Sequence, residues 1–150
     1  DLVPTTMIYE NLLETIGKNG KKIRTAKNEV LELGTSKVEI FKPESDSSNL
    51  NNYSVCVKIT HGDNSFLLTG DTEKTAEKDF AKKYGSKLSA KVYKMGHHGS
   101  ETASRAELLD EVLPRYAIIS CAKDNDYGHP HEEAVDRIKG LKVYGTGYWN

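Results

Sequence analysis

The chain has 150 residues, of which 37% are hydrophobic and 29% are charged, an ordinary composition for one soluble globular domain. Its 21 Lys and Arg residues nearly cancel its 22 Asp and Glu residues, so its overall charge does not draw it toward nucleic acid, anionic lipid or acidic substrates. Any such partner has to be held locally. No apolar run approaches the roughly 18 residues that a membrane-spanning helix needs, so we expect no direct membrane insertion by this segment.

The first half of the chain is predicted to be rich in short strands. Residues 5–16 carry apolar side chains at helical spacing and end near Gly17, which predicts a helix. Short strands are expected over residues 22–25, 29–33 and 37–41, followed by a polar loop at 44–53. Residues 54–60 and 65–69 then form a predicted hairpin, because the Gly62-Asp63-Asn64 stretch between them favours a turn.

Helices and strands alternate from residue 72 onward. Helices are predicted over 73–84, 105–113 and 131–138, and strands over 90–95, 115–121 and 141–144. Ser104 and Glu107 have the spacing of a capping box at the start of the second of these helices, and Pro130 suits the first turn of the third. A hairpin-rich half followed by an alternating half predicts a layered α/β architecture with a mixed sheet.

The two cysteines lie inside apolar segments that we expect to form strands. Cys56 and Cys121 are 65 positions apart, and neither belongs to a short Cys-x-x-Cys pair. This pattern favours free, structurally packed thiols over a disulfide framework or a zinc motif.

Residues able to bind a metal ion follow three of the predicted strands. Asp71 follows residues 66–70, the pair His97 and His98 follows 92–96, and His129 follows 118–121. Because open α/β sheets bind ligands beyond the carboxyl ends of their strands, these side chains are expected to converge on one rim. A carboxylate can bridge two divalent cations, and imidazoles supply nitrogen ligands, so the pattern predicts a metal site.

Each of these residues also has a structural interpretation. Asp71 suits the N-cap of the following helix, and the adjacent His97 and His98 would face opposite sides of a regular strand. One structural and one functional histidine is therefore an alternative. His129 and its neighbour His131 sit at a helix start, where they can cap the helix or face solvent.

Three further features have both a functional and a structural interpretation. We assign His61 to an exposed hairpin turn. The hydroxyl of Ser100 can contact a substrate phosphate or form a local turn. A basic cluster near the amino end is either a solvated face or a nucleic-acid track; its members are Lys18, Lys21, Lys22, Arg24 and Lys27.

Three ordered motifs resemble the later motifs of metallo-β-lactamase-fold hydrolases. They are Phe66-Leu67-Leu68-Thr69-Gly70-Asp71, Lys94-Met95-Gly96-His97-His98-Gly99-Ser100 and Asp124-Asn125-Asp126-Tyr127-Gly128-His129-Pro130-His131. Over residues 5–144 the chain resembles the ComEC-like branch, the metallo-hydrolase domains of competence proteins. The resemblance implies an αββα sandwich. Residues 1–150 would form its carboxy-terminal half, a mixed sheet flanked by helices, because the His-x-His-x-Asp-His signature of the amino-terminal half is not present.

The same resemblance implies roles for individual residues. The complete domain would hold two divalent metal ions, Zn or Mn, and hydrolyse phosphodiester or related bonds. Asp71 would be the bridging carboxylate and His97 the second metal ligand. His98 would orient its neighbour or contact the substrate, His129 would contact the substrate or transition state at the rim, and Ser100 would lie nearby as a substrate-binding residue.

The predicted function is therefore that of a metal-dependent phosphodiesterase or nuclease of the ComEC type, acting in DNA uptake at the outside of a bacterial cell. A phosphocholine-type or other small phosphoester is an alternative substrate, and a noncatalytic binding or scaffolding module is an alternative function. Without the missing signature, the isolated chain is expected to bind metal weakly and turn over poorly. A lone half-sandwich would also expose an apolar sheet face. We expect the missing amino-terminal half or a second copy of the chain to cover it.

Overall fold

A computed structural model describes residues 6–44 and 48–147, which form one seven-stranded sheet whose strand order equals the chain order. Neighbouring strands are antiparallel from β1 to β4 and parallel from β4 to β7, which confirms the predicted mixed sheet. The strands are β1 (Glu29–Leu33), β2 (Ser36–Phe41), β3 (Cys56–His61), β4 (Asn64–Leu68), β5 (Val92–Lys94), β6 (Tyr116–Ile119) and β7 (Lys142–Gly145).

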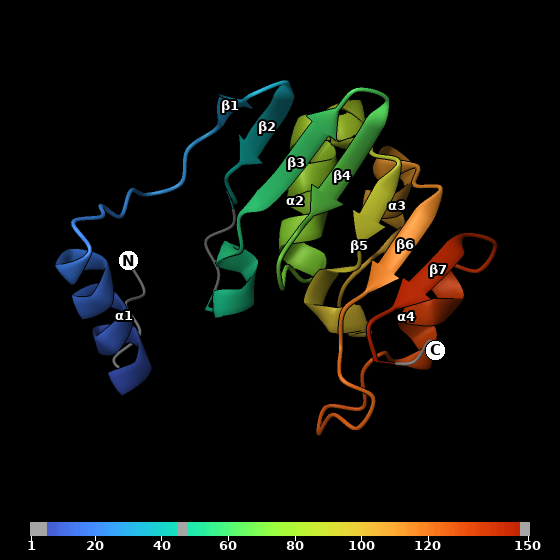
Figure 1. The fold of residues 1–150 in the computed structure, drawn as a ribbon. Helices are drawn as coiled ribbons and strands as arrows, with labels where there is room; N and C mark the ends of the chain where they lie inside the picture. Colours follow the sequence, from blue (N-terminus) through green and yellow to red (C-terminus); the bar gives the residue numbers. More distant parts are fainter. Residues whose placement is uncertain (1–5, 45–47, 148–150) are drawn as a thin grey trace.

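Of the four α-helices in the described residues, three cover one face of the sheet. Figure 1 shows α2, α3 and α4 behind the strands, whereas α1 stands apart near the amino end. The helices are α1 (Met7–Lys18), α2 (Lys74–Tyr84), α3 (Ala106–Val112) and α4 (Glu132–Arg137), and short 3-10 turns form at Leu50–Tyr53, Gly85–Leu88 and Gly96–Gly99. No helix in the described parts of the chain combines the length and apolar character needed to cross a membrane.

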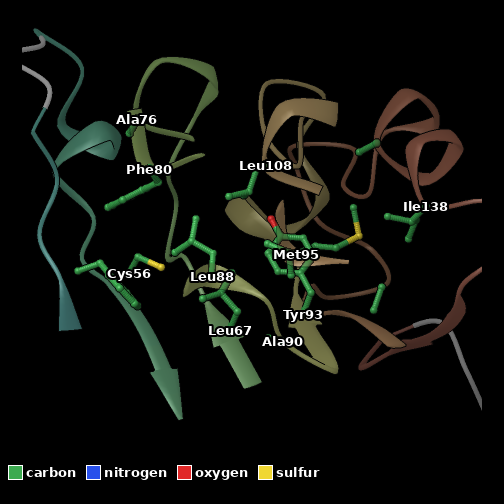
Figure 2. Close-up of a cluster of buried hydrophobic side chains, with 14 of the residues drawn as sticks. Cys56, Leu67, Ala76, Phe80, Leu88, Ala90, Tyr93, Met95, Leu108 and Ile138 are labelled. Atoms are coloured by element: carbon green, nitrogen blue, oxygen red, sulfur yellow. The ribbon is translucent and has the colours of Figure 1, made fainter. Parts of the chain in front are cut away.

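The hydrophobic core lies between the sheet and these three helices. Leu67, Tyr93 and Ala117, from three adjacent parallel strands, are fully buried. Figure 2 shows Leu67 and Tyr93 packed with Phe80 of α2, Leu108 of α3 and other apolar side chains. Because side chains alternate along a strand, the residues on either side of these three face the opposite surface of the sheet.

That opposite surface is apolar and open. It contains a hollow of about 350 Å³, and Phe66, one of the residues that line this hollow, is 39% exposed. In the part of the chain that the structure describes, helices cover only the other face (Figure 1). Apolar side chains lining the hollow are Ile59, Phe66, Leu68, Val92 and Ile118.

Two expectations about the first half of the chain are confirmed. The hairpin forms with Gly62 and Asp63 between β3 and β4, and Cys56 and Cys121 are free thiols. The predicted strand at 22–25 is wrong, because residues 21–27 have no regular structure; Ile23 is 60% exposed and flanked by cationic side chains, so no apolar face directs a strand there. Residue 5, where the first helix is predicted to start, and residues 45–47 of the predicted loop lie outside the described residues.

Two helix starts differ from the prediction. The N-cap of α3 is Arg105, so the Ser104–Glu107 capping box is wrong. The backbone N–H of Ser104 donates instead to the buried carboxylate of Glu77, at 2.6 Å, and this stronger acceptor displaces the local cap. His131 is the N-cap of α4, so Pro130 precedes that helix rather than lying in its first turn.

Candidate active site

The parallel half of the sheet brings the predicted site residues together. Because β4, β5 and β6 run in the same direction, the loops that follow them emerge at one edge. Asp71, His97, His98 and His129, contributed by these loops, line one pocket of about 350 Å³. Ser100 is not among its lining residues: it is buried, and its hydroxyl is 2.9 Å from that of Thr102. That contact matches its interpretation as a local turn residue.

A left-handed turn explains how two adjacent histidines reach the same pocket. His97 and His98 have φ values of 44° and 57° within the Gly96–Gly99 turn, a conformation that costs a non-glycine residue roughly 1–3 kcal/mol. On a strand the two rings would point to opposite faces. The surrounding structure holds both residues in a strained conformation that places both rings at the pocket.

His98 faces Asp71 with one ring nitrogen and contacts a backbone carbonyl with the other. Its Nε2 lies 3.4 Å from Oδ1 of Asp71, and its Nδ1 lies 2.6 Å from the carbonyl oxygen of Ser120. When Nδ1 donates to that carbonyl, the lone pair of Nε2 is directed toward the carboxylate side of the pocket. Both side chains are nearly half exposed, so the space between them is accessible to a ligand.

His97 is paired with a carboxylate that the sequence analysis did not identify. Its Nδ1 lies 3.3 Å from Oε1 of Glu73, although without the angle of a hydrogen bond, so the carboxylate acts on the ring electrostatically. Glu73 is itself fixed, because the side-chain amides of Asn49 and Asn51 each donate to one of its oxygens at 3.0 Å. Only the fold brings these two asparagines from the preceding loop to Glu73.

His129 lies deeper in the same cluster and is buried. Burial lowers its pKa, and the neighbouring rings of His131, His97 and His98 lower it further. Its ring stacks between those of Tyr127 and His98, with centroid distances of 5.7 and 6.4 Å. The lowered pKa favours a neutral imidazole at neutral pH.

Two charged side chains hold the backbone that follows the histidine turn. Glu77 of α2 is fully buried and accepts hydrogen bonds from the N–H groups of Ser104 and Arg105, at 2.6 and 2.8 Å. Desolvation raises the pKa of Glu77 to about 7. From α4, Arg137 donates to the carbonyls of Glu101, Ala103 and Ser104, at 2.8 to 3.0 Å. An acid and a base thus fix the N–H and C=O groups of one loop.

Gly96 leaves room for this buried polar cluster directly before the histidines. A Cβ atom at Gly96 would lie 3.2 Å from Oε1 of Glu77, 3.2 Å from Oγ1 of Thr69 and 3.3 Å from Cβ of Ala103. Its N–H donates to the buried hydroxyl of Tyr93. The glycine is therefore needed for close approach between the histidine turn and the Glu77 cluster.

The comparisons with known proteins agree with this architecture. The family model of the metallo-beta-lactamase superfamily matches residues 9–123, so the chain belongs to that superfamily, as the three motifs predicted. It is similar to ComE operon protein 3 of Bacillus subtilis (strain 168), with 32% identity over 132 residues, which are 87% of this chain and 17% of that protein. It is also similar to competence protein ComA of Neisseria gonorrhoeae, with 34% identity over 72% of this chain and 16% of that protein. The chain thus spans less than a fifth of the length of these relatives.

A third relative and a solved structure extend the comparison. Recombination protein 2 of Haemophilus influenzae is 38% identical over 61% of this chain and 11% of that protein. The crystal structure of CmlA, a diiron beta-hydroxylase from Streptomyces venezuelae, superposes with a TM-score of 0.56 over 91% of this chain and 35% of that chain. The two sequences are 16% identical, so the similarity to CmlA concerns the fold alone.

Proposed function

We propose that this chain is part of a ComEC-like, metal-dependent hydrolase that cleaves phosphodiester bonds in DNA at the outside of a bacterial cell. The observation that carries the proposal is the contact between Asp71 and His98, at 3.4 Å, in a pocket that His97 and His129 also line. Membership of the superfamily supports hydrolysis. The names of two relatives, a competence protein and a recombination protein, support DNA as the substrate.

We assign Asp71 and His98 as the metal ligands contributed by this chain. The resemblance placed His97 beside Asp71 in this role, whereas the contacts favour His98, whose Nε2 faces the carboxylate while Ser120 orients the other nitrogen. The described residues contain no group of three or more potential ligands arranged around one ion. A catalytic zinc ion takes three protein ligands, so in this proposal other parts of the working protein supply the rest.

A centre of two divalent ions, Zn or Mn, is proposed from the superfamily and from the diiron enzyme of similar fold. When bound, such ions lower the pKa of a coordinated water and offset charge on the phosphoryl group. His97, whose Nδ1 lies 3.3 Å from Oε1 of Glu73, is the proposed proton donor to the leaving oxygen, since a nearby carboxylate stabilises a protonated imidazole. His129, which is buried but also lines the pocket, would donate a hydrogen bond to a phosphate oxygen.

The test compares two site variants with two matched controls in the whole natural polypeptide that carries this sequence. Asp71→Asn and His98→Gln are expected to lose bound metal, measured by elemental analysis, and to cleave a fluorescent oligonucleotide more than about 100-fold more slowly. Asp63→Asn and His61→Gln make the same chemical changes in the exposed β3–β4 hairpin and are expected to change neither value. Full metal content and activity in both site variants would refute the proposal.

A further inference from the structure

Tyr127 is a large aromatic side chain that the fold leaves exposed at the mouth of the pocket. It is 77% exposed, yet it lines the same pocket as Asp71 and His98. Its ring is stacked on that of His129, at 5.7 Å and an interplanar angle of 20°. His129 is in turn stacked on His98, at 6.4 Å and 17°. Three nearly parallel rings therefore lead from the proposed metal ligand His98 outward to Tyr127.

The turn that carries Tyr127 is held by hydrogen bonds on both sides. Oδ1 of Asn125 accepts from the N–H groups of Tyr127 and His129, while its Nδ2 donates to the carbonyls of Ala122 and His129. Nδ1 of His131 accepts from the N–H of Glu101 at 3.0 Å, so Nε2 carries the proton and donates to the carbonyl of Tyr127. These hydrogen bonds fix the backbone of Tyr127, and the contact with the His129 ring orients its side chain. An exposed ring that is already oriented loses little conformational entropy when it binds a partner.

We infer that Tyr127 is a stacking platform for an unpaired nucleobase next to the phosphate being cleaved, which makes single-stranded nucleic acid the substrate. This inference rests on the proposed function and names its substrate class. Every nucleobase has a planar face that stacks on an aromatic side chain, largely independently of sequence. In the interior of a duplex those faces are covered by neighbouring base pairs, so a base there has to leave the stack before it can use the platform.

The surroundings of Tyr127 favour a base over a choline group. Sites for quaternary ammonium groups enclose the cation with several aromatic faces, whereas Tyr127 is the one Phe, Tyr or Trp among the described residues lining this pocket. The rings next to it are imidazoles. The exposed turn carries Asp124 and Asp126 beside a single Lys123, so its net charge is negative. In this inference the base therefore contacts Tyr127, and the phosphate lies over the histidines.

The experiment separates recognition of the base from recognition of the backbone, again in the whole natural polypeptide. Its two ligands are a fluorescent single-stranded oligo-dT and an oligomer of equal length with an abasic site at every position. Binding of each is measured by anisotropy in EDTA, and cleavage with Mn²⁺. Tyr127→Leu is expected to raise Kd and KM for oligo-dT by about 5- to 100-fold, to change kcat less, and to leave the values for the abasic oligomer unchanged. Tyr127→Phe is expected to behave like the wild type. Tyr144→Leu, which removes an exposed tyrosine of β7, is the matched control.

Two results would overturn the inference: no binding of oligo-dT by the wild type, or equal losses for both oligomers in Tyr127→Leu. Binding of oligo-dT that depends on Tyr127, without cleavage in Mn²⁺, would support the inference and refute the hydrolase proposal. The two proposals therefore fail in distinguishable ways.

Discussion

Glu77 links the stability of the protein to pH, and the substitution Glu77→Gln tests this linkage. The folded pKa of this carboxyl is about 7 against an ordinary 4.5, because burial opposes its charge more than the N–H groups of Ser104 and Arg105 and the positive charges of Arg105 and Arg137 favour it. Since the folded state holds the proton more tightly, the wild-type protein loses stability as pH rises from 4.5 to 7. The loss is complete about one pH unit above the folded pKa, near pH 8, and the contribution then stays constant.

The size of the effect follows from the two pKa values. A rise from 4.5 to about 7 corresponds to about 3 kcal/mol, most of which is lost between pH 5 and 8. Gln does not titrate, so the variant lacks this slope. At pH 5 the folded wild type holds Glu77 protonated, so its OH group, like the NH₂ group of Gln, replaces one of the two acceptor oxygens, and the two proteins are expected to have similar stability. Toward pH 8 the wild type loses stability through the linkage and the variant does not, so the variant is expected to become the more stable of the two.

Urea unfolding followed by circular dichroism at pH 5, 6, 7 and 8 measures this difference. Subtracting the wild-type free energy of unfolding cancels every other group that titrates in both proteins. Glu107→Gln, on the exposed side of α3, is the matched control and is expected to differ little from the wild type at any pH. A difference between Glu77→Gln and the wild type that stays constant from pH 5 to 8 would show that the reasoning about Glu77 is wrong.

Two further substitutions test the loops that form the pocket. Gly96→Ala places a Cβ 3.2 to 3.3 Å from three buried atoms, so we expect it to lower the free energy of unfolding by about 1–3 kcal/mol and to lower the Tm. Gly17→Ala, where nothing lies within 4 Å of the added Cβ, is the control. Equal Tm values for the two variants would contradict the packing argument. Asn125→Ala removes the acceptor of the Tyr127 and His129 N–H groups, so hydrogen exchange of both amides is expected to accelerate at least about 5-fold, and unchanged protection would mean that another contact holds the turn.

The sequence predicted the location of the site because that location depends on local patterns. Asp71, His97 and His129 each follow an apolar strand segment, and in a parallel sheet such positions meet at one edge. Nothing equally local indicated Glu73, whose contact with His97 depends on asparagines more than 20 positions earlier in the chain. The sequence indicated that His97 and His98 could share one site only if the chain turned there, because on a strand their rings would face opposite sides. It did not indicate that the turn is left-handed.

The burial of Glu77 follows from a pattern that is present in the sequence. It lies three and four positions before Phe80 and Ala81, on the same helical face as these buried residues, where a carboxylate needs hydrogen-bond partners. The prediction of a capping box at Ser104 was wrong because of this same buried carboxylate. Its local pattern was correct, but the N–H of Ser104 was already occupied by an acid 27 positions away.

The equality of strand order and chain order has a consequence for synthesis on the ribosome. In the described residues each strand after β1 pairs with the strand made just before it, so all the strands of the antiparallel meander β1 to β4 have been synthesised once the ribosome has added residue 68. Each later segment then adds one helix and one strand to an existing edge. The nascent chain never has to wait for a distant partner, and at each stage the newest strand forms the growing edge of the sheet.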